Sequence, residues 1–116
     1  MVDYRGGKLT IEKVPARALA RRFGTPLYAY SKAAMTDRCR SLKAAFKSLE
    51  PLICYAMKAN SNGALCRVLA REGCGADIVS GGELLRALKA GFAPNRIVFS
   101  GVGKSLDELE LAVRRG

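Results

Sequence analysis

Residues 52–60 read Leu-Ile-Cys-Tyr-Ala-Met-Lys-Ala-Asn, an apolar run that begins after Pro51 and stops abruptly at Lys58. Six consecutive apolar residues bounded in this way are typical of a strand buried on both faces, as in parallel sheets covered by helices. Loops at the carboxyl ends of such strands line the functional site in parallel α/β folds. The sequence therefore places Lys58 where chemistry is expected.

The same order of strand and helix repeats on both sides of this run. We predict strands at residues 26–30, 52–57, 76–79 and 96–100, followed by helices at about residues 32–49, 64–71, 84–90 and 105–116. Ser31 is expected to cap the first of these helices, and capping boxes are expected at Ser80 with Glu83 and at Ser105 with Glu108. This repeat predicts an α/β fold, either a (β/α)-barrel or a doubly wound sheet, which the pattern alone does not separate.

The chain is shorter than a complete barrel. Eight units need about 250 residues, so 116 residues would hold about half of one, and we expect an N-terminal fragment of a longer protein. A short strand at residues 8–12 and a helix at residues 15–23 precede the first barrel strand. We expect that short strand to pair with a segment outside this chain. The predicted division is a lead-in strand and helix at residues 1–24 and a partial barrel at residues 25–116.

Composition narrows the possible partners. Lys and Arg number 20 against 10 for Asp and Glu, and this excess raises nucleic acid as a partner. The basic residues recur singly at helical spacing, however, without a basic run or an aromatic RNA-binding signature, so no nucleic-acid partner is predicted. No apolar segment approaches the roughly 20 residues of a membrane span, and no secretory signal is present. A cytoplasmic location without a membrane partner is expected.

The cysteines do not suggest a metal. Four are present without a Cys-x-x-Cys pair, and the chain has no histidine, so no metal site is predicted. Reduced thiols within the packing are expected instead.

Three residue patterns could carry chemistry. Lys58, if surrounded by barrel core, would be partly desolvated, which favours a neutral amine that can form a Schiff base. The alternative is a strand-terminal lysine that extends to solvent. Asp77 is a carboxylate within an apolar strand and could favour a charged lysine nearby. Residues 101–105, Gly-Val-Gly-Lys-Ser, lack the first glycine of a phosphate-binding loop, because Val98 occupies its position, so a tight strand-to-helix turn is predicted there.

At these residues the chain resembles a known family. Residues 24–31 (Gly-Thr-Pro-Leu-Tyr-Ala-Tyr-Ser), 55–62 (Tyr-Ala-Met-Lys-Ala-Asn-Ser-Asn), 76–84 (Ala-Asp-Ile-Val-Ser-Gly-Gly-Glu-Leu) and 96–105 (Arg-Ile-Val-Phe-Ser-Gly-Val-Gly-Lys-Ser) are similar to the fold-type-III pyridoxal-phosphate-dependent decarboxylases, and most of all to the diaminopimelate decarboxylases. Four blocks in this order cover nearly the whole chain and are far more specific than any one of them.

The resemblance implies the N-terminal part of an alanine-racemase-like (β/α)8 barrel that binds pyridoxal 5'-phosphate. It also implies a β domain, to which the short N-terminal strand would belong. Lys58 matches the lysine that holds the cofactor, Ala56 a small residue close to the ring, and Asp77 the acidic strand residue beside them. Ser80 and Glu83 match positions near the same pocket, although capping explains them sufficiently. The implied reaction is decarboxylation of meso-diaminopimelate to L-lysine by a homodimeric enzyme.

The resemblance also implies that the phosphate-binding loop, the acid facing the pyridine nitrogen and the substrate-binding arginine lie beyond Gly116. We therefore expect this chain to be inactive alone and to need the remainder of the barrel and the β domain. Two alternatives remain open: a segment of an ornithine or arginine decarboxylase, and a non-catalytic half-barrel that associates with itself.

Overall fold

The computed structural model describes residues 2–116. The chain divides into two compact units, Met1–Arg38 and Cys39–Gly116, and each is described by itself. This boundary lies further along the chain than the division at residues 24 and 25 expected from the sequence, which stays a prediction for the domains of the longer protein.

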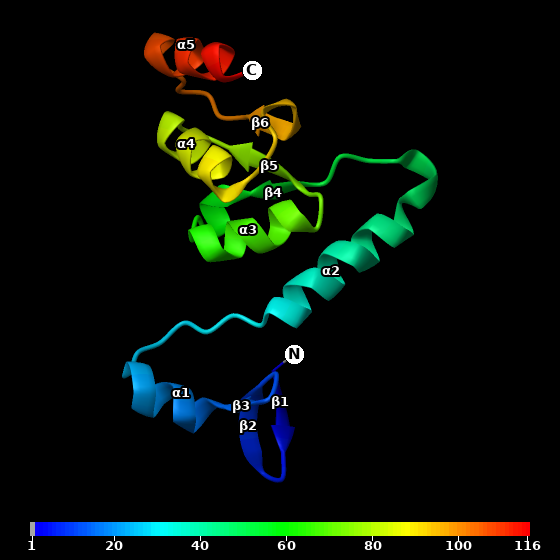
Figure 1. Ribbon diagram of the computed structural model, residues 1–116, viewed down its shortest axis with the longest axis vertical. Helices are drawn as coiled ribbons and strands as arrows, with labels where there is room; N and C mark the ends of the chain where they lie inside the picture. Colours follow the sequence, from blue (N-terminus) through cyan, green and yellow to red (C-terminus); the bar gives the residue numbers. More distant parts are fainter. Residues whose placement is uncertain (1) are drawn as a thin grey trace. The chain divides into compact units, whose positions relative to one another are not determined.

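The first unit begins with an antiparallel sheet in the order β1-β2-β3 (Figure 1). Its strands are β1 (Val2–Arg5), β2 (Lys8–Ile11) and β3 (Val14–Pro15). Gly6 and Gly7 join β1 to β2 with φ of 53° and 72°, the left-handed pair that a two-residue hairpin requires. The expectation that the strand at residues 8–12 pairs outside the chain is therefore wrong, because the glycine turn folds β1 onto one edge of β2 and β3 occupies the other.

Both predicted helices near the N-terminus are present. Helix α1 (Ala16–Phe23) ends at Gly24, and α2 (Lys32–Ala45) begins after Ser31. The backbone N–H of Ala34 donates to the Ser31 hydroxyl at 3.0 Å, which confirms the predicted cap. Glu12 adds to it, since its carboxylate accepts from the Ala33 N–H and from the Ser31 hydroxyl, both at 2.8 Å. These two hydrogen bonds hold the pKa of Glu12 below its ordinary value.

The strand predicted at residues 26–30 is not observed. These residues form no ladder with any segment that the structure describes, and the Leu27, Tyr28 and Tyr30 side chains are exposed. The aromatic and apolar pattern indicated a strand, but a strand exists only when a neighbour accepts and donates its backbone hydrogen bonds. Pro26, in addition, has no N–H to donate.

The second unit is built on a parallel sheet in the order β4-β5-β6. Each strand is followed by a helix, as the sequence pattern predicts, although the first and third strands are shorter than expected. The strands are β4 (Cys54–Ala56), β5 (Gly75–Ile78) and β6 (Ile97–Phe99), and the helices that follow them are α3 (Gly63–Arg71), α4 (Gly81–Ala90) and α5 (Leu106–Arg115). Three single turns of 3-10 helix complete the unit: η1 (Lys47–Leu49), η2 (Met57–Ala59) and η3 (Pro94–Arg96).

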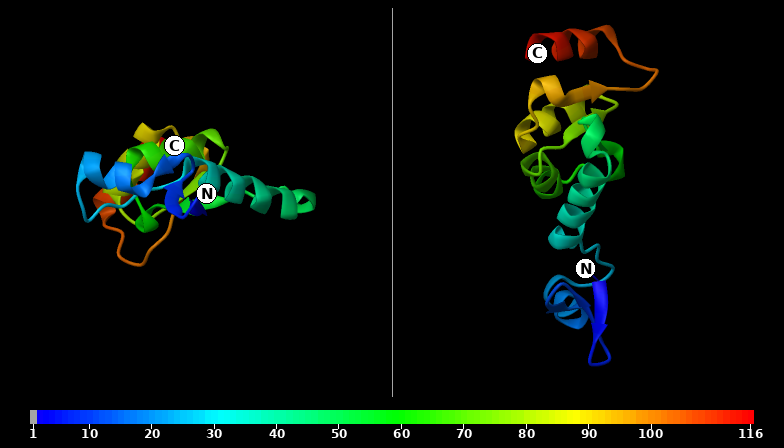
Figure 2. Two further views of the ribbon diagram at one scale, coloured as in Figure 1. Left: turned by 90° about the horizontal axis from the view of Figure 1, so that it is seen from below. Right: turned by 90° about the vertical axis from the view of Figure 1, so that its right-hand side faces the viewer.

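The core of the second unit lies between the sheet and its helices. Helix α3 contacts α4, and α4 contacts β5 and β6 (Figures 1 and 2). On this face of the sheet Ala76 and Ile78 are fully buried. The helices and loops add further buried apolar side chains, namely Met57, Cys66, Leu69, Leu84, Ala87 and Phe92. Because side chains alternate along a strand, Asp77 projects to the opposite face.

Capping fixes where α4 and α5 begin. Ser105 and Glu108 form the predicted capping box in full. At α4 only half of the predicted box is present: the Ser80 hydroxyl accepts from the Glu83 N–H at 3.2 Å, but the Glu83 carboxylate accepts from the N–H of Val79 instead of Ser80. The Glu108 carboxylate also reaches the start of α4 and accepts from the Gly81 N–H at 2.8 Å.

Across residues 2–116, none of the helices combines the length and the apolar character needed to span a bilayer.

Candidate active site

The candidate site begins with a row of residues across the parallel sheet. The strand register pairs Ala56 with Asp77 and Asp77 with Val98. Paired residues of neighbouring strands project to the same face, and here it is the face opposite the buried Ala76 and Ile78. Asp77 therefore stands between the Ala56 methyl group and the Val98 isopropyl group, and Ala56 is the smaller of these two neighbours.

Ser100 holds the Asp77 carboxylate in place. The Ser100 hydroxyl donates to Oδ1 of Asp77, and the Ser100 N–H donates to the Ile78 carbonyl at 2.8 Å. The second bond continues the β5–β6 ladder by one residue, which sets the position of the Ser100 side chain. A carboxylate that is hydrogen-bonded in this way has one oxygen committed and one available to a partner. Sequence analysis did not identify Ser100 as a site residue, because a serine after a strand looks like an ordinary turn residue.

Lys58 lies on η2, directly after β4. Its neighbour Met57 is fully buried, and η2 contacts β5, the strand that carries Asp77. The Lys58 side chain itself is exposed. The backbone is thus anchored while the amine stays accessible. This exposure agrees with the alternative of a strand-terminal lysine that extends to solvent, and partial desolvation of Lys58 inside a complete barrel core stays a prediction.

The loop after Lys58 is tied back to its strand. The Tyr55 hydroxyl donates to the Asn60 carbonyl at 3.0 Å, and Asn60 Oδ1 accepts from the Asn62 N–H at 2.9 Å. Asn62 in turn caps α3 by accepting from the Ala64 N–H at 2.9 Å. Asn60 and Asn62 therefore fix the path from Lys58 into the next helix, which keeps the lysine in a defined place.

The charge of Asp77 affects the pKa of the nearby Cys54 thiol. Burial raises the pKa of the Cys54 thiol, the Asp77 charge raises it further, and Arg96 lowers it in part. Cys54 is therefore a neutral thiol at pH 7 and not a competing nucleophile on this face. Gly75 lies beside it in the register, and a Cβ there would come within 2.4 Å of the Arg96 carbonyl oxygen and 2.8 Å of the Cys54 sulfur.

Residues 101–105 form the strand-to-helix connection that the sequence predicts. The Lys104 amine donates to the carbonyls of Gly101 at 2.6 Å and Ser100 at 3.2 Å, and lies 5.5 Å from the centre of the Phe99 ring. It is thus directed back onto the strand end. Gly101 has a φ of 89° and turns the chain toward α5.

Ser80 and Glu83 serve the start of α4. Both side chains are engaged with backbone N–H groups there, which accounts for them structurally. For the part of the chain that the structure describes, there is also no group of three or more His, Cys, Asp or Glu side chains that could hold a metal ion.

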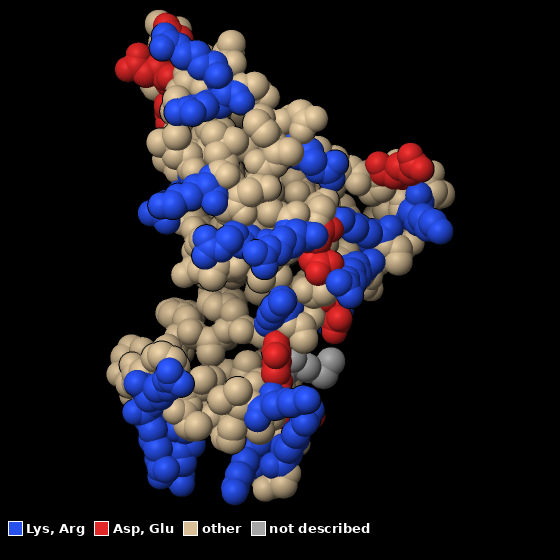
Figure 3. Space-filling model, viewed as in Figure 1, with Lys and Arg blue, Asp and Glu red and all other residues tan. Residues whose placement is uncertain are grey.

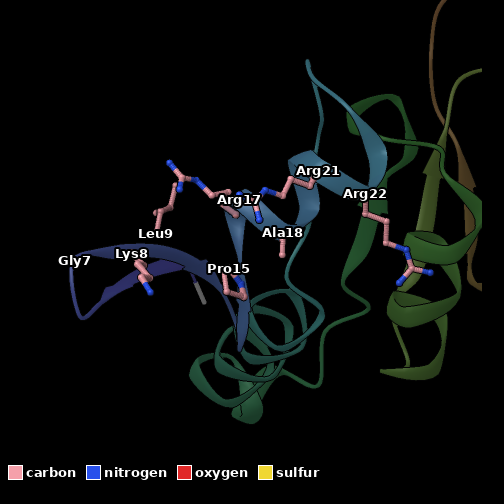
Figure 4. A pocket seen from close by; sticks show the side chains of 9 residues that line it. Gly7, Lys8, Leu9, Pro15, Arg17, Ala18, Arg21 and Arg22 are labelled. Carbon is pink, nitrogen blue, oxygen red and sulfur yellow. The ribbon is translucent and has the colours of Figure 1, made fainter.

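A separate basic hollow lies in the first unit. It has a volume of about 890 Å³, and Lys8, Arg17, Arg21 and Arg22 line it together with apolar residues of β2 and α1 (Figure 4). None of these four cations makes an ion pair with an acid within residues 2–116. In space-filling view the basic side chains of this unit stand out (Figure 3). Sequence analysis missed this cluster because Lys8 is distant in sequence from the three arginines.

Comparison with known proteins gives a consistent result. The family described as "Pyridoxal-dependent decarboxylase, pyridoxal binding domain" matches residues 32–116. Diaminopimelate decarboxylase of Pseudomonas fluorescens is 49% identical over 114 residues, covering 98% of this chain and 27% of that protein. The enzyme of the same name from Aquifex aeolicus is 52% identical over 112 residues, covering 97% and 26%.

Solved structures agree. The crystal structure of diaminopimelate decarboxylase from M. jannaschii in co-complex with L-lysine matches with a TM-score of 0.94 at 37% identity, covering 99% of this chain and 28% of that one. The chain thus spans about a quarter of the length of the relatives it matches. The resemblance carried by the four sequence blocks is confirmed, and so is the expected fold, the N-terminal part of the pyridoxal-binding barrel.

Proposed function

The chain belongs to the pyridoxal-dependent decarboxylase family through its pyridoxal-binding domain, and on that basis we propose that Lys58 binds pyridoxal 5'-phosphate covalently in an enzyme that converts meso-diaminopimelate to L-lysine. The single observation that carries this proposal is the placement of an accessible amine on η2, in contact with the strand that presents Asp77 beside Ala56.

The residues present fit the aldehyde end of the cofactor. A Schiff base requires an accessible primary amine on a fixed backbone, and Lys58 meets both conditions because Met57 anchors η2. A flat ring over the sheet needs small neighbouring side chains, and the Ala56 methyl group next to Asp77 is one. The Asp77 carboxylate, held by Ser100, supplies a negative charge that favours a cationic partner.

Each residue then has a defined task. When bound, pyridoxal phosphate supplies the electron sink that accepts the electrons left by the departing carboxylate. Lys58 Nζ would hold the cofactor covalently, and whenever this amine is free it could hold a proton near the reacting atoms. Asp77 stabilises positive charge near this amine, and Ser100 is a positioning residue for Asp77. Ala56 keeps the surface beside them small.

The substrate is proposed from the relatives. Those with about half of their residues identical to this chain are named diaminopimelate decarboxylases, and one solved relative is in complex with L-lysine. Ornithine or arginine as substrate is the runner-up. The remainder of the barrel, the β domain, a homodimeric assembly and a cytoplasmic location belong to the same proposal.

The test uses the full-length enzyme with pyridoxal phosphate. We expect release of CO₂ from meso-diaminopimelate, little from L-ornithine or L-arginine, and a loss of at least about 1,000-fold in kcat for Lys58→Ala. Lys89→Ala is the matched control, because it removes an exposed lysine that lies on α4 and not on η2, and it should retain full activity. Full activity of Lys58→Ala would refute the role of Lys58. A preference for ornithine or arginine would refute the substrate alone.

A further inference from the structure

Two cysteines far apart in the sequence meet in the second unit. Cys39 lies on α2 and Cys74 directly precedes β5, and their sulfur atoms are 2.9 Å apart although 35 residues separate them. Both thiols are free and buried, with exposed fractions of 7% and 4%. Cys54 and Cys66, the other two thiols, have no such partner among the described residues.

The pair sits beside a polar clamp. The Arg40 guanidinium donates to both carboxylate oxygens of Glu72, at 2.8 Å and 3.1 Å. Lys43, one turn along α2 from Cys39, donates to the Glu72 carbonyl. The clamp therefore holds α2 against the segment that leads into β5, and it holds the two sulfur atoms together.

We propose that Cys39 and Cys74 are an oxidisable dithiol that forms an intramolecular disulfide with a low-molecular-weight disulfide as oxidant. Only a small approach of the two sulfur atoms is needed, because they already lie within 2.9 Å. The bond would join α2 to the amino end of β5. Asp77 and Ser100 lie at the other end of the strands, so the candidate active site is left undisturbed.

The chemistry balances as two thiol–disulfide exchanges. The thiolate of one cysteine attacks the oxidant, one small thiol leaves, and a mixed disulfide remains. The second cysteine, after losing its proton, attacks the protein sulfur of that mixed disulfide and expels the second small thiol. The two protein thiols are oxidised, and one molecule of the small disulfide is reduced to two thiols.

The surroundings make the first step slow. Burial, and the hydrogen bond and charge of Cys39, raise the pKa of Cys74 to about 12, so its thiolate is scarce at pH 7. Reaction must wait until the clamp opens and α2 moves away from Glu72. Once formed, the bond is buried and equally hard for a reductant to reach. The disulfide should therefore form and break slowly, so that it stabilises the fold and does not act as a rapid redox sensor.

The experiment incubates the purified protein with glutathione disulfide at pH 8 and follows it by peptide mass spectrometry without reduction. A peptide pair linked through Cys39 and Cys74 is expected, with a rise in Tm of about 10 °C or more that dithiothreitol reverses. Arg40→Gln should accelerate the linkage at least about threefold by weakening the clamp. Arg114→Gln, which removes an exposed pair on α5, should not change the rate.

The test uses the wild-type protein, so its outcome does not depend on whether a variant that lacks Cys39 or Cys74 can fold. Accumulation of glutathione on Cys54 or Cys66 without the linked peptide would overturn the proposal. Linkage only in denaturant would overturn it as well, because the folded geometry would then play no part.

Discussion

The hydroxyl of Ser100 donates a hydrogen bond to the carboxylate of Asp77 and so joins the carboxyl ends of β5 and β6. This contact explains how a carboxylate can stand in an apolar strand although no arginine or lysine of residues 2–116 forms an ion pair with it. It also orients that carboxylate toward the open face on which Ala56 lies.

Ser100→Ala should therefore weaken both stability and function. Loss of a hydrogen bond to a charged, half-buried group is expected to lower the free energy of unfolding by about 1 kcal/mol. In the full-length enzyme we expect kcat to fall several-fold, because Asp77 loses its orientation. Urea unfolding and CO₂ release measure the two effects. Ser61→Ala, whose hydroxyl accepts only a 3.4 Å contact from Arg86, is the control and should change neither. An unchanged kcat for Ser100→Ala would contradict the positioning role.

Gly75→Ala should be strongly destabilising. Its Cβ would lie 2.4 Å from the Arg96 carbonyl oxygen and 2.8 Å from the Cys54 sulfur, so β4 and β6 would have to move apart. We expect a loss of about 2–3 kcal/mol in the free energy of unfolding. Gly103→Ala is the matched control, because nothing lies within 4 Å of the Cβ it would add. Equal free energies of unfolding for the two variants, measured in urea, would contradict the close approach of the Arg96 carbonyl oxygen and the Cys54 sulfur to Gly75.

Glu108 should make stability depend on pH. Its carboxylate accepts from the N–H groups of Gly81 and Ser105 at 2.8 Å and 3.0 Å, and these bonds hold its pKa below the ordinary 4.5. As pH falls below about 4.5, the unfolded chain takes up this proton before the folded chain does. The stabilisation is thus complete above that pH and is lost as pH falls through the lowered pKa.

The measurement is the urea midpoint between pH 7 and pH 3. Glu108→Gln should start with a lower midpoint and show a shallower decline on acidification than the wild type. Glu110→Gln removes an exposed carboxylate whose ion pair within residues 2–116 is with Arg114, so it should follow the wild-type curve. A Glu108→Gln curve parallel to that of the wild type would show that another group controls acid unfolding.

The parallel unit could be predicted from the sequence because its signals are local. The six apolar residues before Lys58 specify a strand. A serine caps each of two helix starts, and a glycine follows each helix end. Each of these signals acts without help from distant parts of the chain. The prediction of a strand at residues 26–30 was wrong for the opposite reason. The existence of that strand depends on a neighbouring strand, which no local pattern can guarantee.

The site was predicted only in part. Lys58 and Asp77 stood out from their positions at or within apolar strands, whereas Ala56 was identified only through the family resemblance, and the register makes Ala56 and Asp77 neighbours. Their roles toward the cofactor stay predictions. Ser100 could not be identified, since its significance arises from the β5–β6 pairing. The exposure of Lys58 agrees with the alternative of a strand-terminal lysine that extends to solvent, and the sequence alone did not decide between the two because burial depends on what surrounds the whole strand end.

The central claim, that Lys58 is the cofactor lysine, is tested most directly by trapping. The protein is mixed with pyridoxal phosphate, reduced with borohydride and digested, and the modified peptide is located by mass spectrometry, with Lys58→Ala and Lys89→Ala alongside. The account predicts one dominant adduct on Lys58, absent from Lys58→Ala and unchanged in Lys89→Ala. Adducts spread over many surface lysines, with the same pattern in all three proteins, would contradict it.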